Sequence, residues 1–169
     1  AVIQRLRRYA QDMPLPAPLL HRRLARLADF SILLRHIRSA VDDTGYVRDH
    51  ASPTLHNVRQ TLARLRERIQ RTLQTTMATH SAVVQDAIVT IRNDRFVIPL
   101  KTDFRQTMRG IVHGESASGA TVYVEPDQVV DLNNQLLQNR AAEERAIRVV
   151  LQELTERLSV QKVALQHAL

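Results

Sequence analysis

The spacing of apolar residues changes twice along this chain, and that change constrains the fold more than any other feature. Residues 55–77 and 129–165 repeat aliphatic side chains at intervals of three and four, which is typical of one face of an α-helix. Between them, residues 87–126 alternate apolar and polar side chains with a period of two, which is typical of half-buried strands. The sequence therefore predicts a long helix, a small sheet and a second long helix, in that order.

Local signals set the expected bounds of the helices. Ser52-Pro53 is a helix start, because a hydroxyl can cap the first turn and proline is tolerated there, and the stripe that follows predicts a helix over about residues 53–82. Earlier patterns predict an Arg-rich amphipathic stretch over residues 2–12 and a helix over about 18–40. No Gly or Pro interrupts residues 127–169, which predicts one helix about 63 Å long.

Four strands are expected between the long helices. Asn93-Asp94 predicts a hairpin turn between the first two, and the small residues of HGESASGA predict a tight loop between the last two, with Gly119 at positive φ. Pro99 is expected at a strand edge or end, because proline cannot donate to a sheet ladder.

The predicted fold class is mainly α with a small antiparallel β meander. Residues 1–52 are expected to form part of a helical core and residues 53–84 an outgoing lever helix. Residues 85–126 are expected to form a β-rich clamp and residues 127–169 a returning long lever helix. Two matching stripes separated by a sheet that reverses the chain predict antiparallel helices with the sheet at their tip.

Composition excludes several classes of protein. The chain has no Cys, which excludes disulfides, thiolate metal sites and a Cys nucleophile. No apolar run approaches the roughly 18 residues that a membrane span needs, and no signal peptide opens the chain, so we expect no membrane partner and a cytoplasmic location. The chain starts with Ala inside a helical pattern, which we interpret as a piece of a larger protein.

The loop HGESASGA resembles two functional motifs, a phosphate-binding loop and a nucleophile elbow, but it lacks residues that each of them requires. Gly114 and Gly119 have the spacing of a phosphate-binding loop, but Ala120 and Thr121 follow instead of Lys and Ser or Thr. A nucleophile elbow needs glycine two residues after its serine and a helix beyond, whereas Ser118 and a strand are found. His113 and Glu115 should share a strand face, as a polar cross-strand pair rather than a metal site, since a third ligand is missing. We expect no catalytic, metal-binding or cofactor-binding residue here.

The charge is unevenly distributed. The net charge is +7, and residues 1–84 hold 14 Arg against 6 acidic residues, whereas residues 85–126 hold five basic and five acidic residues. An excess of positive charge of this size is typical of a protein that binds a polyanion such as nucleic acid. It also fits an Arg-rich surface that is exposed to solvent and has no partner. Relative to Leu62, the side chains of Arg64, Arg68 and Arg71 lie at about 200°, 240° and 180° around the helix, so they form one outward ridge.

The ridge and the residues nearer the sheet are the candidate phosphate contacts, with a solvated helix face as the alternative. The full candidate set is Arg64, Arg68, Arg71, Arg92, Arg95, Lys101, Arg105, Arg109, Ser116 and Ser118. Aromatic residues are not interleaved with the basic ones, which argues against recognition of single strands by base stacking.

Three segments carry a resemblance to a known family. DDTGYVRDHASPTLHNVR, RNDRFVIPLKTDFR and GIVHGESASGATVYVEPDQVVDLNNQL together resemble the MutS family in its MutS-two branch, over about residues 42–140. The resemblance implies a core, lever and clamp fragment, which is the same arrangement that periodicity predicts.

The resemblance also implies a function for the longer protein. Members are similar in binding branched DNA and are described as suppressing recombination, and some are described as splitting collided ribosomes. They carry a dimerising ATPase domain that uses ATP and Mg, and usually an Smr nuclease domain. This chain is then expected to bind DNA or ribosomal RNA rather than to hydrolyse anything. The alternative is a mechanical lever and dimerisation scaffold with no nucleic-acid contact of its own.

Overall fold

The computed structural model describes residues 2–12, 18–19 and 29–166. These residues belong to two units: Thr54–Arg145 forms one, and Ala1–Pro53 with Ala146–Leu169 forms the other. The first of these contains the sheet and most of the buried side chains, and it is called here the sheet unit. The other is called the terminal unit.

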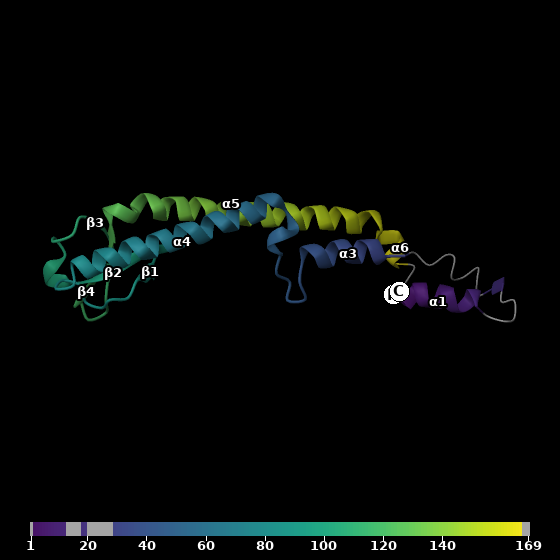
Figure 1. Cartoon of the computed structure of the whole chain (residues 1–169), viewed down its shortest axis with the longest axis horizontal. Helices are drawn as coiled ribbons and strands as arrows, with labels where there is room; N and C mark the ends of the chain where they lie inside the picture. Colours follow the sequence, from purple (N-terminus) through teal and green to yellow (C-terminus); the bar gives the residue numbers. More distant parts are fainter. Residues whose placement is uncertain (1, 13–17, 20–28, 167–169) are drawn as a thin grey trace. The chain divides into compact units, whose positions relative to one another are not determined.

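Two helices of the sheet unit pack against each other along their apolar stripes. Helix α4 (Pro53–Thr79) starts at the predicted proline, and α5 (Asp127–Val160) starts directly after the sheet. An ion pair joins Arg59 near the start of α4 to Glu143 of α5, and the Thr76 hydroxyl near the end of α4 donates to Gln128 at the start of α5. The two helices therefore run antiparallel in this unit, as predicted, and Figure 1 shows them side by side.

The core lies between these helices and one face of the sheet. Leu62, Leu65, Ile69, Leu73 and Met77 of α4 meet Val129, Leu132 and Leu136 of α5, together with Phe96, Ile98, Leu100, Val122 and Val124 of the sheet. The predicted stripe of α4 is thus confirmed as the buried one.

The sheet has four antiparallel strands, but it is not the predicted meander. Strands β1 (Thr90–Arg92), β2 (Arg95–Lys101), β3 (Gly110–Glu115) and β4 (Thr121–Pro126) are arranged in the order β1-β2-β4-β3. The reason lies in burial: β2 and β4 are buried over most of their length, whereas β3 is mostly exposed. Pairing the two most apolar strands in the middle leaves the exposed strand at an edge.

Two of the predicted turns are confirmed. Asn93 and Asp94 both adopt left-handed backbone, with φ of 49° and 62°, as a two-residue hairpin between β1 and β2 requires. Gly119 has φ of 71° in the loop between β3 and β4. Gly110 is constrained differently, because a Cβ there would lie 2.3 Å from the carbonyl oxygen of Glu125.

Pro99 lies inside β2 rather than at its end, opposite Tyr123 of β4. Its carbonyl accepts from the Gln85 N–H, on the side away from β4. Because N and O of one strand residue point to the same side, the missing N–H of Pro99 removes nothing from the β2–β4 ladder. The prediction of an edge or end is therefore wrong, because the chain at residues 83–85 lies along this side of β2: Val84 bridges Leu100, and the Lys101 N–H donates to the Val83 carbonyl.

In the terminal unit, the helices are shorter than predicted. Helix α1 (Val2–Gln11) is where the amphipathic stretch was expected, but α3 (Ser31–Ala40) covers only the end of the helix predicted over 18–40, and residues 20–28 lie outside the described part. The Asp29 carboxylate accepts from the N–H of Ser31, the first residue of α3.

The predicted single helix over 127–169 is two helices, because α5 ends at Val160 and α6 (Lys162–Gln166) follows. Val160 is 87% exposed, so the last turn of α5 buries little apolar surface to hold it. Residues 167–169 lie outside the described part.

A short turn follows α3 and leads to the 3-10 helix η1 (Asp49–Ala51). The Asp42 carboxylate accepts from the Thr44 hydroxyl and from the N–H groups of Thr44 and Tyr46. These bonds, led by that of the Thr44 hydroxyl, hold the pKa of Asp42 below its usual value. Gly45 has φ of 87° in this turn.

Candidate nucleic-acid interface

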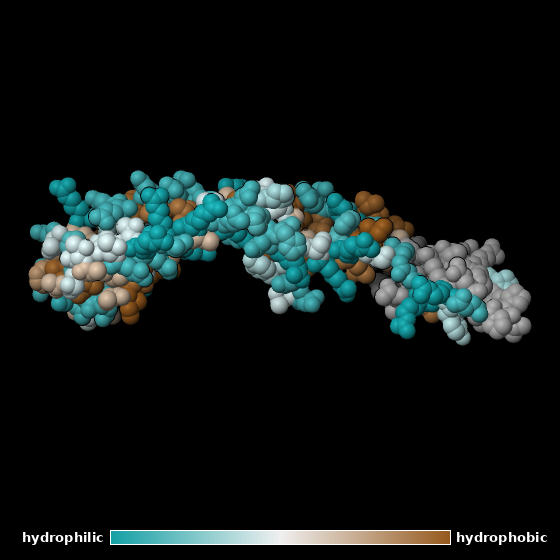
Figure 2. Space-filling view, in the orientation of Figure 1, coloured by the Kyte–Doolittle hydropathy of each residue, from teal (hydrophilic) through white to brown (hydrophobic). Residues whose placement is uncertain are grey.

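The outer face of α4 carries the predicted ridge. Arg64, Arg68 and Arg71 are all exposed, on the side away from the buried stripe, and the surface over α4 is largely hydrophilic (Figure 2). Arg71 pairs with Glu67 at 2.5 Å, and Arg64 donates to the Gln60 side chain at 3.3 Å. Arg68 makes no ion pair with any described residue. The name "α4 ridge" is used below for these three arginines.

The segment around β2 and β3 contributes three more of the predicted cations. Arg105 and Arg109 are exposed between the two strands. Lys101 ends β2, and its ammonium donates to the Ala82 carbonyl at 3.0 Å, which ties it to the chain after α4. The side chains of Arg105 and Arg109 are therefore less constrained than that of Lys101.

Arg92 has an aromatic partner that the sequence did not reveal. Its guanidinium carbon lies 4.1 Å from the centre of the Tyr123 ring. The strand register puts both on one face of the sheet, because Arg92 is opposite Arg95 and Tyr123 is opposite Pro99. This face points away from Ile98 and the core. The two are called the stacked pair below.

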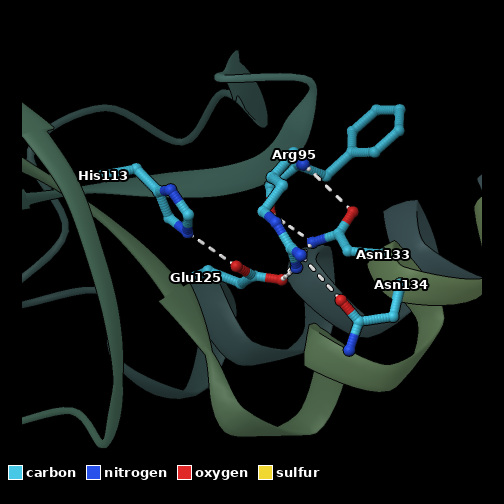
Figure 3. A network of polar contacts seen from close by, with 6 residues as sticks. Arg95, His113, Glu125, Asn133 and Asn134 are labelled. Atoms are coloured by element: carbon cyan, nitrogen blue, oxygen red, sulfur yellow. Dashed lines mark hydrogen bonds and ion pairs between the residues drawn. The ribbon is translucent and has the colours of Figure 1, made fainter. Parts of the chain in front are cut away.

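Arg95 differs from the other predicted cations, because its guanidinium is held inside the protein. One of its nitrogens donates to Glu125 at 2.8 Å and another to Asn134 at 2.6 Å (Figure 3). Its side chain is only 21% exposed. These contacts join β2 to β4 and to α5, so Arg95 has a structural role.

Glu125 is the centre of a buried polar network that was not predicted. Its carboxylate is fully buried and accepts from Arg95, from the Asn133 amide at 2.9 Å and from Nε2 of His113 at 2.6 Å (Figure 3). A buried carboxylate needs such partners, because desolvation without them is costly. The only sequence signal for this residue is that an acidic side chain lies in an apolar strand, directly before Pro126.

Asn133 completes the edge of the sheet where β4 ends. Its carboxamide accepts from the Phe96 N–H at 3.1 Å and donates to the Phe96 carbonyl at 3.0 Å. The side chain thus replaces a neighbouring strand for one residue of β2, and it joins α5 to the sheet. Only an amide offers both a donor and an acceptor in this arrangement.

His113 and Glu115 do not share a face, contrary to the prediction. A bulge in β3 puts Val112 opposite Val124 and Glu115 opposite Val122, so one extra residue lies between them. The extra residue shifts the alternation, and Gly114 has φ of 121° there. His113 consequently meets Glu125, whereas Glu115 is exposed.

The loop between β3 and β4 is a turn, as predicted. The Ser116 hydroxyl oxygen accepts from the Thr121 N–H at 3.1 Å, and the Ser116 carbonyl accepts from the Gly119 N–H at 2.9 Å. Ser116 therefore stabilises the loop itself, while Ser118 is exposed at its tip.

Two features are absent from residues 2–12, 18–19 and 29–166. No group of three or more His, Cys, Asp or Glu side chains in these ranges could hold a metal ion. No helix in the same ranges is long and apolar enough to cross a membrane.

Comparison with known proteins gives consistent relatives. No protein-family model matches the chain. It is 45% identical over 142 residues to the putative endonuclease MutS2 of Bacillus subtilis (strain 168), which covers 83% of this chain and 18% of that protein. It is 46% identical over 132 residues to endonuclease MutS2 of Geobacillus sp. (strain WCH70), covering 77% and 17%, and 42% identical over 144 residues to that of Brevibacillus brevis, covering 84% and 18%.

The chain spans less than a fifth of the length of these relatives. Identity of this degree extends over most of the chain. The chain therefore belongs to the MutS2 family, as a segment of the kind of protein that bears this name.

Proposed function

We propose that this chain is a nucleic-acid-binding segment of a MutS2-type protein, and that it contacts the phosphate backbone of DNA. The observation that carries the proposal is the α4 ridge, where three exposed guanidinium groups follow one another on a helix face that packs against nothing in the sheet unit. Arginine is suited to phosphate because its planar fork donates two parallel hydrogen bonds. Contacts of this kind position a duplex without reading its sequence.

The family resemblance extends the proposal to branched DNA and to ribosomal RNA. Both present closely spaced phosphates, and the ridge has no feature that would separate them. We assign no catalytic residue in this chain. ATP and Mg binding, dimerisation and endonuclease activity are proposed for those parts of a MutS2-type protein that the chain does not cover.

The test compares two arginines of the same helix. Arg68 belongs to the ridge, whereas Arg66, which is also exposed, lies about 40° from Leu62 and on the other side of the helix. Affinity for duplex DNA, a Holliday junction and ribosomes would be measured across a series of salt concentrations. On duplex DNA, Arg68→Gln is expected to reduce the slope of log K against log salt by about 0.9, because one phosphate contact is lost. Arg66→Gln is expected to leave the slope unchanged.

Equal slopes for these two variants and the wild type would assign the ridge to solvent. A wild type without salt-dependent binding to any of the three partners would refute nucleic-acid binding altogether. That result would favour the second candidate function, a mechanical scaffold. The long buried contact between α4 and α5 supports this alternative, since it would stiffen the segment without a ligand.

A further inference from the structure

We infer that Arg92, held on the ring of Tyr123, is a preformed phosphodiester-binding group on the sheet, separate from the α4 ridge. The inference rests on the proposed function and names a specific site within it. Arg92 is exposed, and among the described residues it makes no ion pair. Its single weak hydrogen bond, from Nη1 to the Ile91 carbonyl at 3.4 Å, leaves most of its five N–H donors unused.

The sheet register explains how the stack is held. Arg92 is on β1 and Tyr123 on β4, with β2 between them, so their backbones lie about 9–10 Å apart across the sheet. Their partners on β2, Arg95 and Pro99, are four residues apart, so the two residues are also offset along the strands and their side chains meet diagonally across β2. Val97 of β2 lies on this face along the way, and it is fully buried. The methylene groups of Arg92 are the natural cover for Val97, with the charged end carried beyond it onto the ring.

The stack fixes the direction in which the guanidinium can bind. One flat side rests on the aromatic ring, so the remaining N–H groups point outward in the plane of the guanidinium. Two of them have the spacing that phosphate oxygens accept. Because the side chain is already ordered, binding costs less conformational entropy than it would for a free surface arginine.

Neighbouring charges leave Arg92 uncompensated. Arg95, directly opposite on β2, is balanced by the buried carboxylate of Glu125. Asp94, the closest acid in sequence, is paired with Arg140 at 2.9 Å. The site therefore has a positive charge that attracts an anion, and a backbone phosphate of duplex DNA or RNA is the ligand with this chemistry.

The experiment uses the 169-residue chain and titrates it with a blunt duplex DNA, and in parallel with a duplex RNA of the same sequence, over a series of salt concentrations. Arg92→Gln is expected to reduce the slope of log K against log salt by about 0.9 on DNA and about 0.7–0.9 on RNA. Arg66→Gln removes the same charge elsewhere and is the matched control. The duplex that the wild type binds more tightly at equal salt identifies the nucleic acid.

Two variants test the stack rather than the charge. Tyr123→Leu removes the ring but no charge, and Arg92→Lys keeps the charge and the apolar stem but loses the fork. Both are expected to weaken binding about two- to fivefold with an unchanged salt slope. Far-ultraviolet circular dichroism checks that each variant is folded.

The outcomes separate this inference from the proposed function. Binding by the wild type with Arg92→Gln indistinguishable from Arg66→Gln overturns the Arg92 site and leaves the α4 ridge untouched. Wild-type affinity for both Tyr123→Leu and Arg92→Lys overturns the role of the stack. A wild type that binds neither duplex overturns the proposed function, and this inference with it.

Discussion

At the scale of single residues, the sheet unit is organised around one buried carboxylate. Glu125 gathers an arginine from β2, a histidine from β3 and an amide from α5, so four separate elements meet at one side chain. Such a group contributes specificity as well as energy, because any rearrangement of a strand would leave a buried charge without a partner. Asn133 tolerates the fewest replacements in this network, because its side chain must donate hydrogen bonds and accept one at the same time.

Replacing Asn133 by Asp tests this directly. The change keeps the shape but converts the donating nitrogen into a carboxylate oxygen, which faces the Phe96 carbonyl and the Glu125 carboxylate. We expect the free energy of unfolding to fall by about 3–5 kcal/mol, because a buried charge is left unpaired. Urea denaturation followed by circular dichroism measures it.

The neighbouring residue provides the control. Asn134 only accepts from Arg95, and a carboxylate accepts equally well, so Asn134→Asp should change the stability by no more than about 0.5 kcal/mol. If both variants lowered the free energy of unfolding by similar amounts, the hydrogen bonds donated by the Asn133 amide would not explain the effect.

At the scale of elements, stability rests on the contact between α4 and α5. Leu136 of α5 is fully buried in the core, whereas Gln135 beside it is exposed. Leu136→Ala is expected to lower the free energy of unfolding by about 2–5 kcal/mol, and Gln135→Ala by no more than about 0.5 kcal/mol. Chemical denaturation of both variants measures the difference. Loss of less than about 1 kcal/mol at Leu136 would contradict a tightly packed contact.

The elements were predictable from the sequence because their causes are local. Helix α4 follows from its stripe and from Pro53, and the first hairpin follows from Asn93-Asp94, since such turns need residues that tolerate positive φ. The order of the strands was not predictable, because alternation shows which face of a strand is buried but not which strand is its neighbour.

The site was predictable only in part, for the same physical reason. The ridge is set by helical spacing, so Arg64, Arg68 and Arg71 could be placed from the sequence alone. The partners of Arg95 are 30 and 39 residues away, and neither spacing nor composition indicates them. The bulge at Gly114 likewise depends on how β3 fits against β4.

At the scale of the whole molecule, net charge and the proposed interface do not coincide. The sheet unit holds 12 Lys and Arg against 10 Asp and Glu, whereas the terminal unit holds 12 against 7. The larger excess is thus in the terminal unit, yet the α4 ridge and the stacked pair are both in the sheet unit. Nucleic acid could be held by phosphate contacts at these defined residues, or it could be attracted by the overall positive charge of the chain. The two possibilities predict different effects when arginines are removed from one unit or the other.

Combining the two sites distinguishes these possibilities. Changing the α4 ridge and Arg92 together to Gln removes four charges from the sheet unit. Each contact contributes about 0.9 to the salt slope on duplex DNA, and independent sites add, so the slope should fall by about 3–4 units, against about 2–3 for the ridge alone. Titrations of the same DNA at several salt concentrations measure both values.

A variant of equal net charge completes the test. Arg5, Arg35, Arg38 and Arg148 are exposed in the terminal unit, and their combined change to Gln also removes four charges. If phosphates are held at defined positions on α4 and the sheet, this control keeps most of its slope, because a charge that contacts no phosphate releases few counterions. Equal falls in the two variants would mean that the chain attracts nucleic acid through its overall charge, with no preferred surface.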